Sequence, residues 1–105
     1  MQEPIYSDLC ADPELQEIVA DFVGELPRRI ESMRESHREG SWESLQTLAH
    51  QVKGAAGSYG FDPVTPVAGA LEFAARDRAP EMEIEKAITE LQTLVERLSA
   101  DPPVD

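Results

Sequence analysis

Apolar residues recur at three- and four-residue spacing along most of the chain, which is the pattern of helices that bury one face. Four such segments are separated by glycines, prolines and capping residues, and no stretch shows the alternation of a strand. The apolar stripes of the four predicted helices consist, in order, of Leu15, Ile18, Val19, Phe22, Leu26, Ile30 and Met33; of Trp42, Leu45, Leu48, Ala49, Val52, Ala56 and Tyr59; of Val64, Val67, Ala68, Leu71, Ala74 and Ala75; and of Ile84, Ala87, Ile88, Leu91, Leu94, Val95 and Leu98.

Capping and turn residues set the ends of these helices. Asp12 is a good N-cap, and Pro13 suits the first helical position. Gly40 is expected to end the first helix, and Asp62 is expected to cap the third. Pro27 lies inside the first helix and should bend it without ending it, because the apolar stripe continues beyond this residue.

The short connections between these helices favour antiparallel neighbours. The predicted fold class is therefore all-α, an up-and-down antiparallel four-helix bundle with a short N-terminal lead segment that contains Ile5, Tyr6 and Leu9. The 105 residues suffice for one domain, which spans residues 1–105. The tail, about residues 100–105, is expected to fray.

Charge excludes several classes of partner. The chain has 21 acidic and 9 basic residues, a net charge of −12, so we expect it to bind neither nucleic acid nor an anionic membrane surface. The single cysteine, Cys10, excludes an internal disulfide and is expected to be a half-buried apolar residue. The N-terminal residues do not resemble a signal peptide, and no window approaches the roughly 20 apolar residues of a membrane span. We therefore expect a cytoplasmic protein that is monomeric.

The stretch "LAHQVKGAAGSYGF", residues 48–61, carries the candidate chemistry. At about 100° per residue, His50, Lys53, Gly54 and Gly57 fall on the outward side of the second helix, roughly 160° from the centre of its apolar stripe. Two glycines inside a helix cost something like 2 kcal/mol. Packing explains them poorly because they face away from the core, so we expect that a large partner must come close to His50.

Lys53 narrows the chemistry at this histidine. It follows His50 by three residues, so its ammonium can reach a group attached to the imidazole. A cation at this place suits an anionic adduct, such as a phosphoryl group on a ring nitrogen. A neutral imidazole is itself a nucleophile.

The segment "AHQVKGAAGSYG" resembles the signature of histidine-containing phosphotransfer (HPt) domains, which is His-x-x-Lys-Gly followed by small residues and a later Gly. His50, Lys53, Gly54, Gly57 and Gly60 fall on this pattern. The resemblance extends over most of the chain, since the long first helix and the two closing helices also fit.

This resemblance implies a phosphorelay intermediate that is a phosphoryl carrier and not an enzyme. His50 would accept a phosphoryl group from the aspartyl phosphate of a receiver domain, or from a kinase, and pass it to the aspartate of a response regulator. Lys53 would balance charge, Gly54 and Gly57 would give steric access, and Gln51 and Ser58 are candidates for hydrogen bonds near the ring. No cofactor and no bound metal are expected, because Mg²⁺ would come from the acidic pocket of the receiver.

The expected partners are receiver domains of response regulators and of hybrid histidine kinases. Their contact surface should include the exposed part of the second helix and the adjoining faces of the first or third. The candidates for this surface are the apolar residues Val23, Phe61 and Phe73 and the arginines Arg28, Arg29 and Arg34.

Other interpretations compete with phosphotransfer. A helical docking module could bind receivers without transfer, although docking alone needs neither a nucleophile nor a cation beside it. A metal site fails on ligand number, because His37 and His50 are the only histidines and lack ligand spacing. A hydrolase with His50 as general base has no evident Ser or Cys nucleophile and no pocket. Length and the chain ends favour a free-standing shuttle over a module of a larger kinase.

Overall fold

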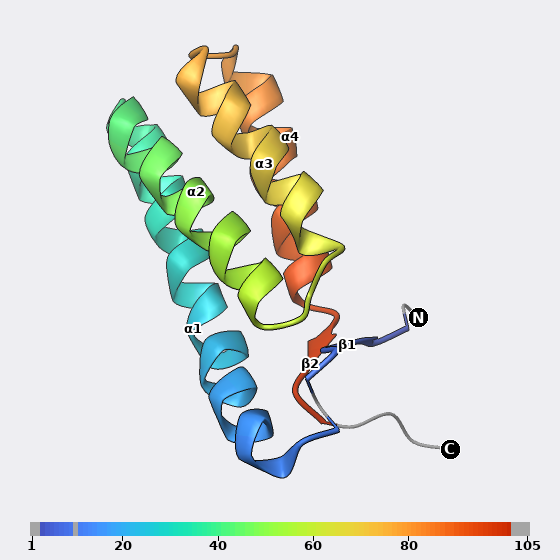
Figure 1. Ribbon diagram of the computed structural model, residues 1–105. Coiled ribbons are helices and arrows are strands. Elements are labelled where there is room, and N and C mark those ends of the chain that lie inside the picture. Colours follow the sequence, from blue (N-terminus) through green and yellow to red (C-terminus); the bar gives the residue numbers. More distant parts are fainter. Residues whose placement is uncertain (1–2, 10, 102–105) are drawn as a thin grey trace.

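The computed structural model describes residues 3–9 and 11–101, and these residues form four helices and two short strands. The helices are α1 (Pro13–Arg38), α2 (Trp42–Ser58), α3 (Val64–Arg76) and α4 (Glu81–Val95), and the strands are β1 (Ile5–Tyr6) and β2 (Leu98–Ser99). The helices run alternately up and down around one core (Figure 1). The predicted all-α four-helix bundle with a short N-terminal lead is therefore confirmed. Cys10 and the end of the tail, residues 102–105, lie outside the described residues.

Of the four helices, α1 alone begins with a side-chain capping hydrogen bond among the described residues. The side chain of Asp12 accepts a hydrogen bond from the amide of Glu14 at 2.9 Å, so it caps α1 as predicted. The helix continues through Pro27 without a break. The prediction for α3 was wrong in detail, because its N-cap residue is Pro63. Asp62 contributes its backbone carbonyl, which accepts from the amide of Thr65 at 3.1 Å, so the turn is closed by backbone groups.

The core lies between the apolar faces of the four helices, and α2 packs most extensively on α3. Ile18, predicted for the apolar stripe of α1, is instead 47% exposed. One turn further along α1, Phe22 stacks on Tyr59, which directly follows the end of α2, with ring centroids 4.6 Å apart. The start of α1 therefore extends beyond the end of α2 (Figure 1), and Ile18 lies in this first part of α1. The buried apolar residues are Val19, Phe22, Leu26, Ile30, Met33, Leu45, Ala49, Val52, Ala56, Phe61, Val64, Ala68, Leu71, Ala75, Ile84, Ile88, Leu91, Val95 and Leu98.

Phe61 also departs from its prediction. It was a candidate for the partner surface, but its side chain is fully buried and its ring lies 6.2 Å from that of Phe22. The reason is the turn after α2. Gly60 adopts a left-handed conformation with φ of 81°, and the amide of Phe61 donates back to the carbonyl of Ala56 at 2.8 Å. This helix-ending motif directs the residue after the glycine back toward the core.

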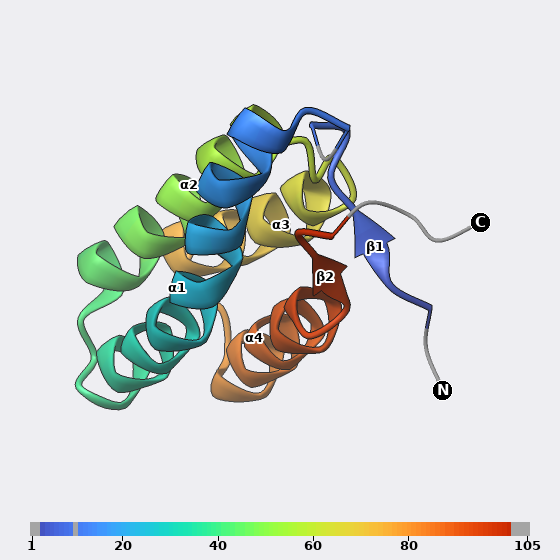
Figure 2. The ribbon, with the colours of Figure 1, turned by 90° about the horizontal axis from the view of Figure 1, so that it is seen from below.

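Two short strands, which the apolar pattern did not predict, join the ends of the chain. β1 pairs with β2 in parallel, with Ile5 opposite Leu98 and Tyr6 opposite Ser99. Figure 2, seen from below, shows the two strands side by side at one end of the bundle. Leu98 belongs to the core, and Ala100 packs against it. A two-residue strand is too short to show alternation, which explains why the sequence pattern missed it.

The N-terminal lead crosses the turn at Gly60. The buried hydroxyl of Ser7 donates to the carbonyl of Tyr59, and the amide of Asp8 donates to the carbonyl of Gly60 at 3.0 Å. A Cβ on Gly60 would lie 2.7 Å from the nitrogen of Asp8 and 2.7 Å from the hydroxyl of Ser7. Gly60 is therefore required by the fold itself, both for its positive φ and for this close approach.

We predict that Gly60→Ala lowers the free energy of unfolding by at least about 1–2 kcal/mol, the cost of a left-handed alanine alone. For a domain of this size each kcal/mol corresponds to a fall of about 4–8 °C in melting temperature. Urea and thermal unfolding followed by circular dichroism measure the loss. Gly24→Ala is the matched control, because nothing lies within 4 Å of its Cβ position in α1. This control should gain up to about 1 kcal/mol. Equal stability of the two variants would contradict the role given to Gly60.

Candidate functional site

His50 projects from α2 into solvent, as the helical periodicity predicted. Its side chain is 65% exposed, whereas its neighbours Ala49 and Val52 are fully buried. Because the helix is anchored by its apolar face, the imidazole is held at a fixed place on a rigid element. This is the arrangement that a side chain needs if a partner is to reach it reproducibly.

A carboxylate from the next helix holds the ring. Oε2 of Glu72, in α3, lies 2.8 Å from Nδ1 of His50. The other oxygen, Oε1, lies 2.7 Å from Nζ of Lys53. Glu72 is only 18% exposed, so His50, Glu72 and Lys53 form a connected, partly buried chain of polar contacts between α2 and α3. We call these three residues the His50–Glu72–Lys53 triad.

Sequence reasoning did not identify Glu72. It lies 22 residues after His50, and no local motif links the two. One signal was present, because Glu72 directly follows the buried Leu71 and so stands at the edge of the apolar stripe of α3. A carboxylate at the edge of a buried face is expected to have a partner on the neighbouring helix.

Neighbouring charges determine whether the Glu72 carboxyl is ionised and therefore which nitrogen of His50 carries the proton. The Lys53 ammonium lowers the pKa of the Glu72 carboxyl from its usual 4.5, and the hydrogen bond with His50 lowers it further, while partial burial opposes both effects. Glu72 is therefore ionised at neutral pH and can only accept hydrogen bonds. Nδ1 of His50 must then be the donor, and in a neutral ring the free lone pair lies on Nε2.

The side chain of Lys53 passes Gly69 on its way to Glu72. A Cβ added to Gly69, in α3, would lie 3.4 Å from Cδ of Lys53, so the bare backbone of Gly69 leaves room for the lysine stem. We expected the ammonium to face a group on the imidazole. In the structure it faces Glu72, and it bears on His50 through that carboxylate.

The two glycines beside His50 are not demanded by packing within the chain. Nothing lies within 4 Å of the Cβ position of Gly54, and at Gly57 only the hydroxyl of Thr65 comes near, at 3.8 Å. Both residues are exposed. The surface below the imidazole is therefore open backbone, in contrast to Gly60, which the N-terminal lead covers.

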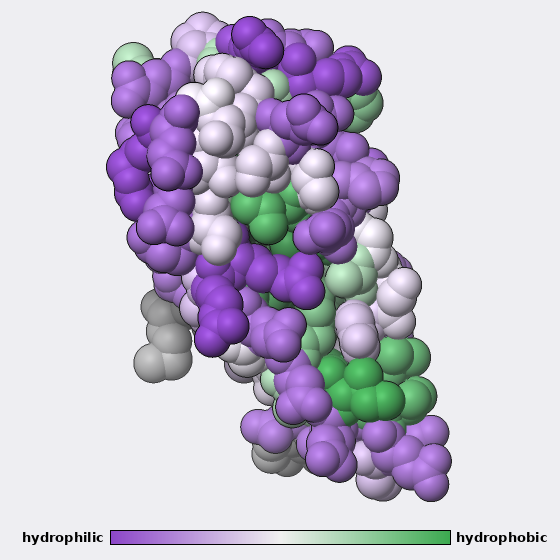
Figure 3. All heavy atoms as spheres, turned by 90° about the vertical axis from the view of Figure 1, so that its left-hand side faces the viewer, coloured by the Kyte–Doolittle hydropathy of each residue, from purple (hydrophilic) through white to green (hydrophobic). Residues whose placement is uncertain are grey.

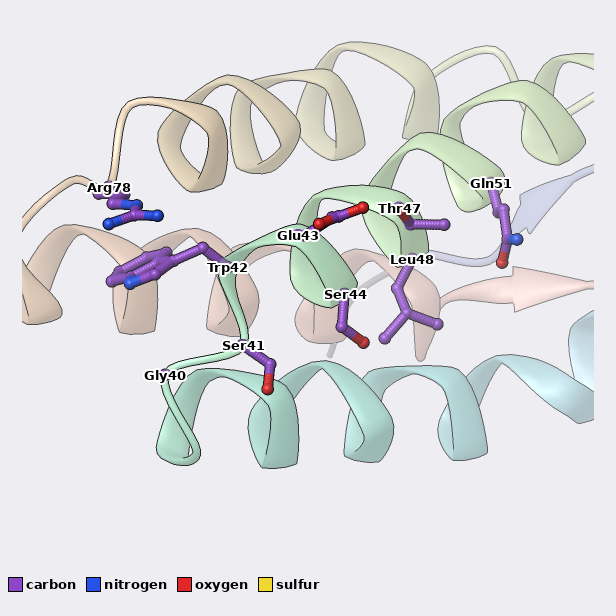
Figure 4. A pocket seen from close by; sticks show the side chains of 9 residues that line it. All are labelled: Gly40, Ser41, Trp42, Glu43, Ser44, Thr47, Leu48, Gln51 and Arg78. Carbon is purple, nitrogen blue, oxygen red and sulfur yellow. The ribbon is translucent and has the colours of Figure 1, made fainter.

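Gln51 and Ser58 are exposed on the same helix, and neither makes a side-chain hydrogen bond to His50 among the contacts of the described residues. Gln51 lines the far end of a shallow hollow of about 680 Å³ that follows α2 toward Trp42 and Arg78 (Figure 4). The hollow leads along the helix and does not contain His50. This hollow therefore lies beside the triad and not at it.

The candidate partner residues of α1 are only partly available. Val23 is half-buried and packs against the core. Arg34 donates to Oε1 of Gln92, in α4, and so faces away from α2. Arg29 pairs with Glu25 at 3.6 Å, and Arg28 is exposed. Of the apolar candidates, Phe73 alone is well exposed, at 57%.

Within residues 3–9 and 11–101, no three histidine, cysteine, aspartate or glutamate side chains gather in a way that could hold a metal ion. In the same part of the chain, no helix is long and apolar enough to cross a membrane.

Comparison with known proteins identifies the class. The family model described as the Hpt domain matches residues 17–101, which include nearly all of α1, the whole of α2, α3 and α4, and the complete triad. The chain belongs to the Hpt domain family. Hpt domains are histidine phosphotransfer modules of two-component signalling and carry a phosphoryl group without being enzymes in the usual sense. Neither the curated proteins nor the solved structures contain a match to the chain.

The lowered pKa of Glu72 makes a prediction about stability and pH. The folded state binds the Glu72 proton less readily than the unfolded chain, so this ion pair stabilises the fold above pH 4.5 and is lost as the pH falls through the lower folded-state pKa. Glu72→Gln should therefore reduce the free energy of unfolding at neutral pH. The difference in free energy of unfolding between this variant and wild type should close below pH 4.5. Urea titrations at a series of pH values measure this difference.

A second background provides the control. In Lys53→Met the main cause of the pKa shift is gone, so adding Glu72→Gln to that variant should lower the free energy of unfolding by less than it does in wild type, at every pH above 4.5. A gap between wild type and Glu72→Gln that persists undiminished to about pH 3 would contradict the ionised carboxylate on which the tautomer of His50 depends.

Proposed function

We propose that this protein is a phosphorelay intermediate. His50 accepts a phosphoryl group from the aspartyl phosphate of a receiver domain, or from a kinase, and transfers it to the aspartate of a response regulator. The observation that supports this most directly is the triad. An exposed imidazole is held at Nδ1 by an ionised carboxylate, which leaves Nε2 as the nucleophile on the solvent side.

The contacts suit an in-line displacement. The lone pair of Nε2 forms an N–P bond while the P–O bond to the receiver's aspartate breaks, and the carboxylate leaves with that electron pair. The ring now carries positive charge that is shared with Nδ1–H. The Glu72 carboxylate, 2.8 Å from Nδ1, stabilises this charge as it develops. In the second transfer the carboxylate of the acceptor attacks phosphorus, and the N–P electrons return to Nε2.

Lys53 supports this chemistry through Glu72. With a cation 2.7 Å away, the carboxylate stays ionised and cannot take the Nδ1 proton in the resting state. The ammonium is also within one helical turn of His50, where it would balance the charge of a phosphoryl group. The chain supplies the nucleophile and its support, and we expect Mg²⁺ to be held by the receiver.

Open backbone around His50 supports a protein partner over a small substrate. The surface at Gly54 and Gly57 has room for the loops of a receiver, because the space at both Cβ positions is open apart from the hydroxyl of Thr65 at 3.8 Å. We further propose that the carrier acts in the cytoplasm as a monomer that meets its donors and acceptors in turn.

Transfer from a phosphorylated receiver domain tests this function. Wild-type protein should take up label that is acid-labile and base-stable, as a phosphoramidate is, and His50→Gln should take up none. Glu72→Gln should slow transfer by at least about 10-fold because the developing charge on the ring loses its counter-ion. Lys53→Ala should also be slower.

His37→Gln is the matched control for the loss of an imidazole. His37 lies in the last turn of α1, where its ring packs edge-on against Trp42 at 5.8 Å, and its removal should leave transfer unchanged. If receivers bind to the wild-type protein but none transfers label to it, the chain is a docking module and the proposed relay function is wrong.

Gly54 gives a second prediction in which stability and activity change in opposite directions. Gly54→Leu should raise the free energy of unfolding by up to about 1 kcal/mol, since leucine is the better helix former and its side chain meets open space. The same change should slow transfer from a receiver, because the new side chain stands where the partner must approach. Gly24→Leu, on the exposed face of α1, should gain stability without loss of transfer. A Gly54→Leu protein that transfers at the wild-type rate would contradict the role in access.

A further inference from the structure

We infer that the receiver domain docks over the α3 side of His50 and that Phe73 is the apolar anchor of this contact, an inference that rests on the proposed function. Aromatic side chains that stand exposed on a monomer and fill a partner's pocket dominate many interfaces. The described residues include three large apolar side chains that are exposed, Ile18, Phe73 and Met82. Their positions relative to His50 decide between them.

Phe73 lies at the level of His50. Its chain neighbour Glu72 bonds directly to the imidazole across the α2–α3 contact, and one residue along a helix is about 1.5 Å of rise. Phe73 also lines a small hollow of about 110 Å³ together with Lys53 and Glu72. The ring therefore borders the triad and is 57% exposed beside it.

The other two exposed side chains lie on α1 and α4, whereas the triad lies on α2 and α3. Phe22 stacks on Tyr59, nine residues past His50, and Ile18 lies a further turn along α1, so Ile18 is about 20 Å from His50 along the helix axes. On the face of the molecule that Figure 3 shows, a compact apolar area lies toward the lower end, where α1 begins. Met82 lies in the first turn of α4, which packs on α1 and α3.

An interface of ordinary size covers roughly 800 Å² per partner, a disc of about 16 Å radius. Centred on His50, it includes Phe73 and excludes Ile18.

Charge favours the same side. Within α2 and α3 the two acidic residues, Glu43 and Glu72, are matched by the two basic residues, Lys53 and Arg76, although the whole chain carries −12. In α4 the four acidic residues face a single Lys86. The receiver's phosphorylation pocket is expected to be acidic, so it is repelled least by the helix pair that bears His50.

Arg76 completes this surface. Its guanidinium lies 4.5 Å from the centroid of the Phe73 ring, and it lines the same hollow as Lys53. Stacking of this kind holds the exposed ring in place and adds a cation at the edge of an apolar contact. An aromatic ring with an arginine over it, next to the nucleophile, fits a partner with an apolar surface beside an acidic pocket, and we assign this place to the receiver.

The test separates docking from chemistry at His50. Transfer is measured from the receiver domain that labels the wild-type protein fastest, and labelling by phosphoramidate, a small donor that needs no docking surface, is measured in parallel. Phe73→Ala should slow transfer from the receiver by about 10-fold or more, as expected for an interface hot spot. Phosphoramidate labelling and the melting temperature should not change, because the side chain is exposed.

Met82→Ala and Ile18→Ala are the matched controls, each an exposed apolar side chain cut to alanine, and both should transfer at the wild-type rate. Equal transfer by Phe73→Ala and wild type would overturn the docking surface while leaving the relay intact. Slow transfer by Ile18→Ala with normal transfer by Phe73→Ala would place the receiver over α1 and overturn it too. If no receiver labels the wild type, the proposed function itself fails, and the inference fails with it.

Discussion

The carboxylate of Glu72 is the interaction on which the site depends. It lies between an exposed imidazole on one helix and an ammonium on the same helix, and it comes from the neighbouring helix. One group therefore sets which ring nitrogen is free, keeps itself ionised through Lys53, and ties the site to the packing of α2 on α3. The bundle has to hold these two helices at a fixed spacing and register for the contact to exist. The core residues Val52, Ala68 and Leu71, which are fully buried, provide that spacing.

Glycine serves two opposite purposes in one short segment. At Gly54 no other part of the chain lies within 4 Å of the Cβ position, so packing within the chain does not require a glycine there. Gly60 is bare because the N-terminal lead passes directly over it and because its φ is positive. The same residue type in the same motif is thus required by the fold at Gly60 and is not required by packing at Gly54. Contact with the rest of the chain distinguishes the two, and sequence spacing does not.

The distribution of charge complements this arrangement. A strongly acidic chain would repel an acidic partner if its charges were spread evenly. Here α2 and α3 have balanced charge, and acidic residues outnumber basic ones in α4 and at the start of α1. An excess of acidic residues repels other acidic surfaces, and the balanced pair of helices is the side where an acidic pocket would meet least repulsion.

The sequence by itself determined the four helices, the capping of α1 by Asp12 and the outward direction of His50. These features depend on residues within one or two helical turns of each other, and the period of about 3.6 residues per turn relates them directly. The tertiary structure alone decided that Glu72 holds His50, that Lys53 faces Glu72, that Phe61 is buried and that Ile18 is exposed. Each of these depends on how far one helix is shifted along another. That shift is set by the fit of many core side chains at once, and no single stretch of sequence contains it.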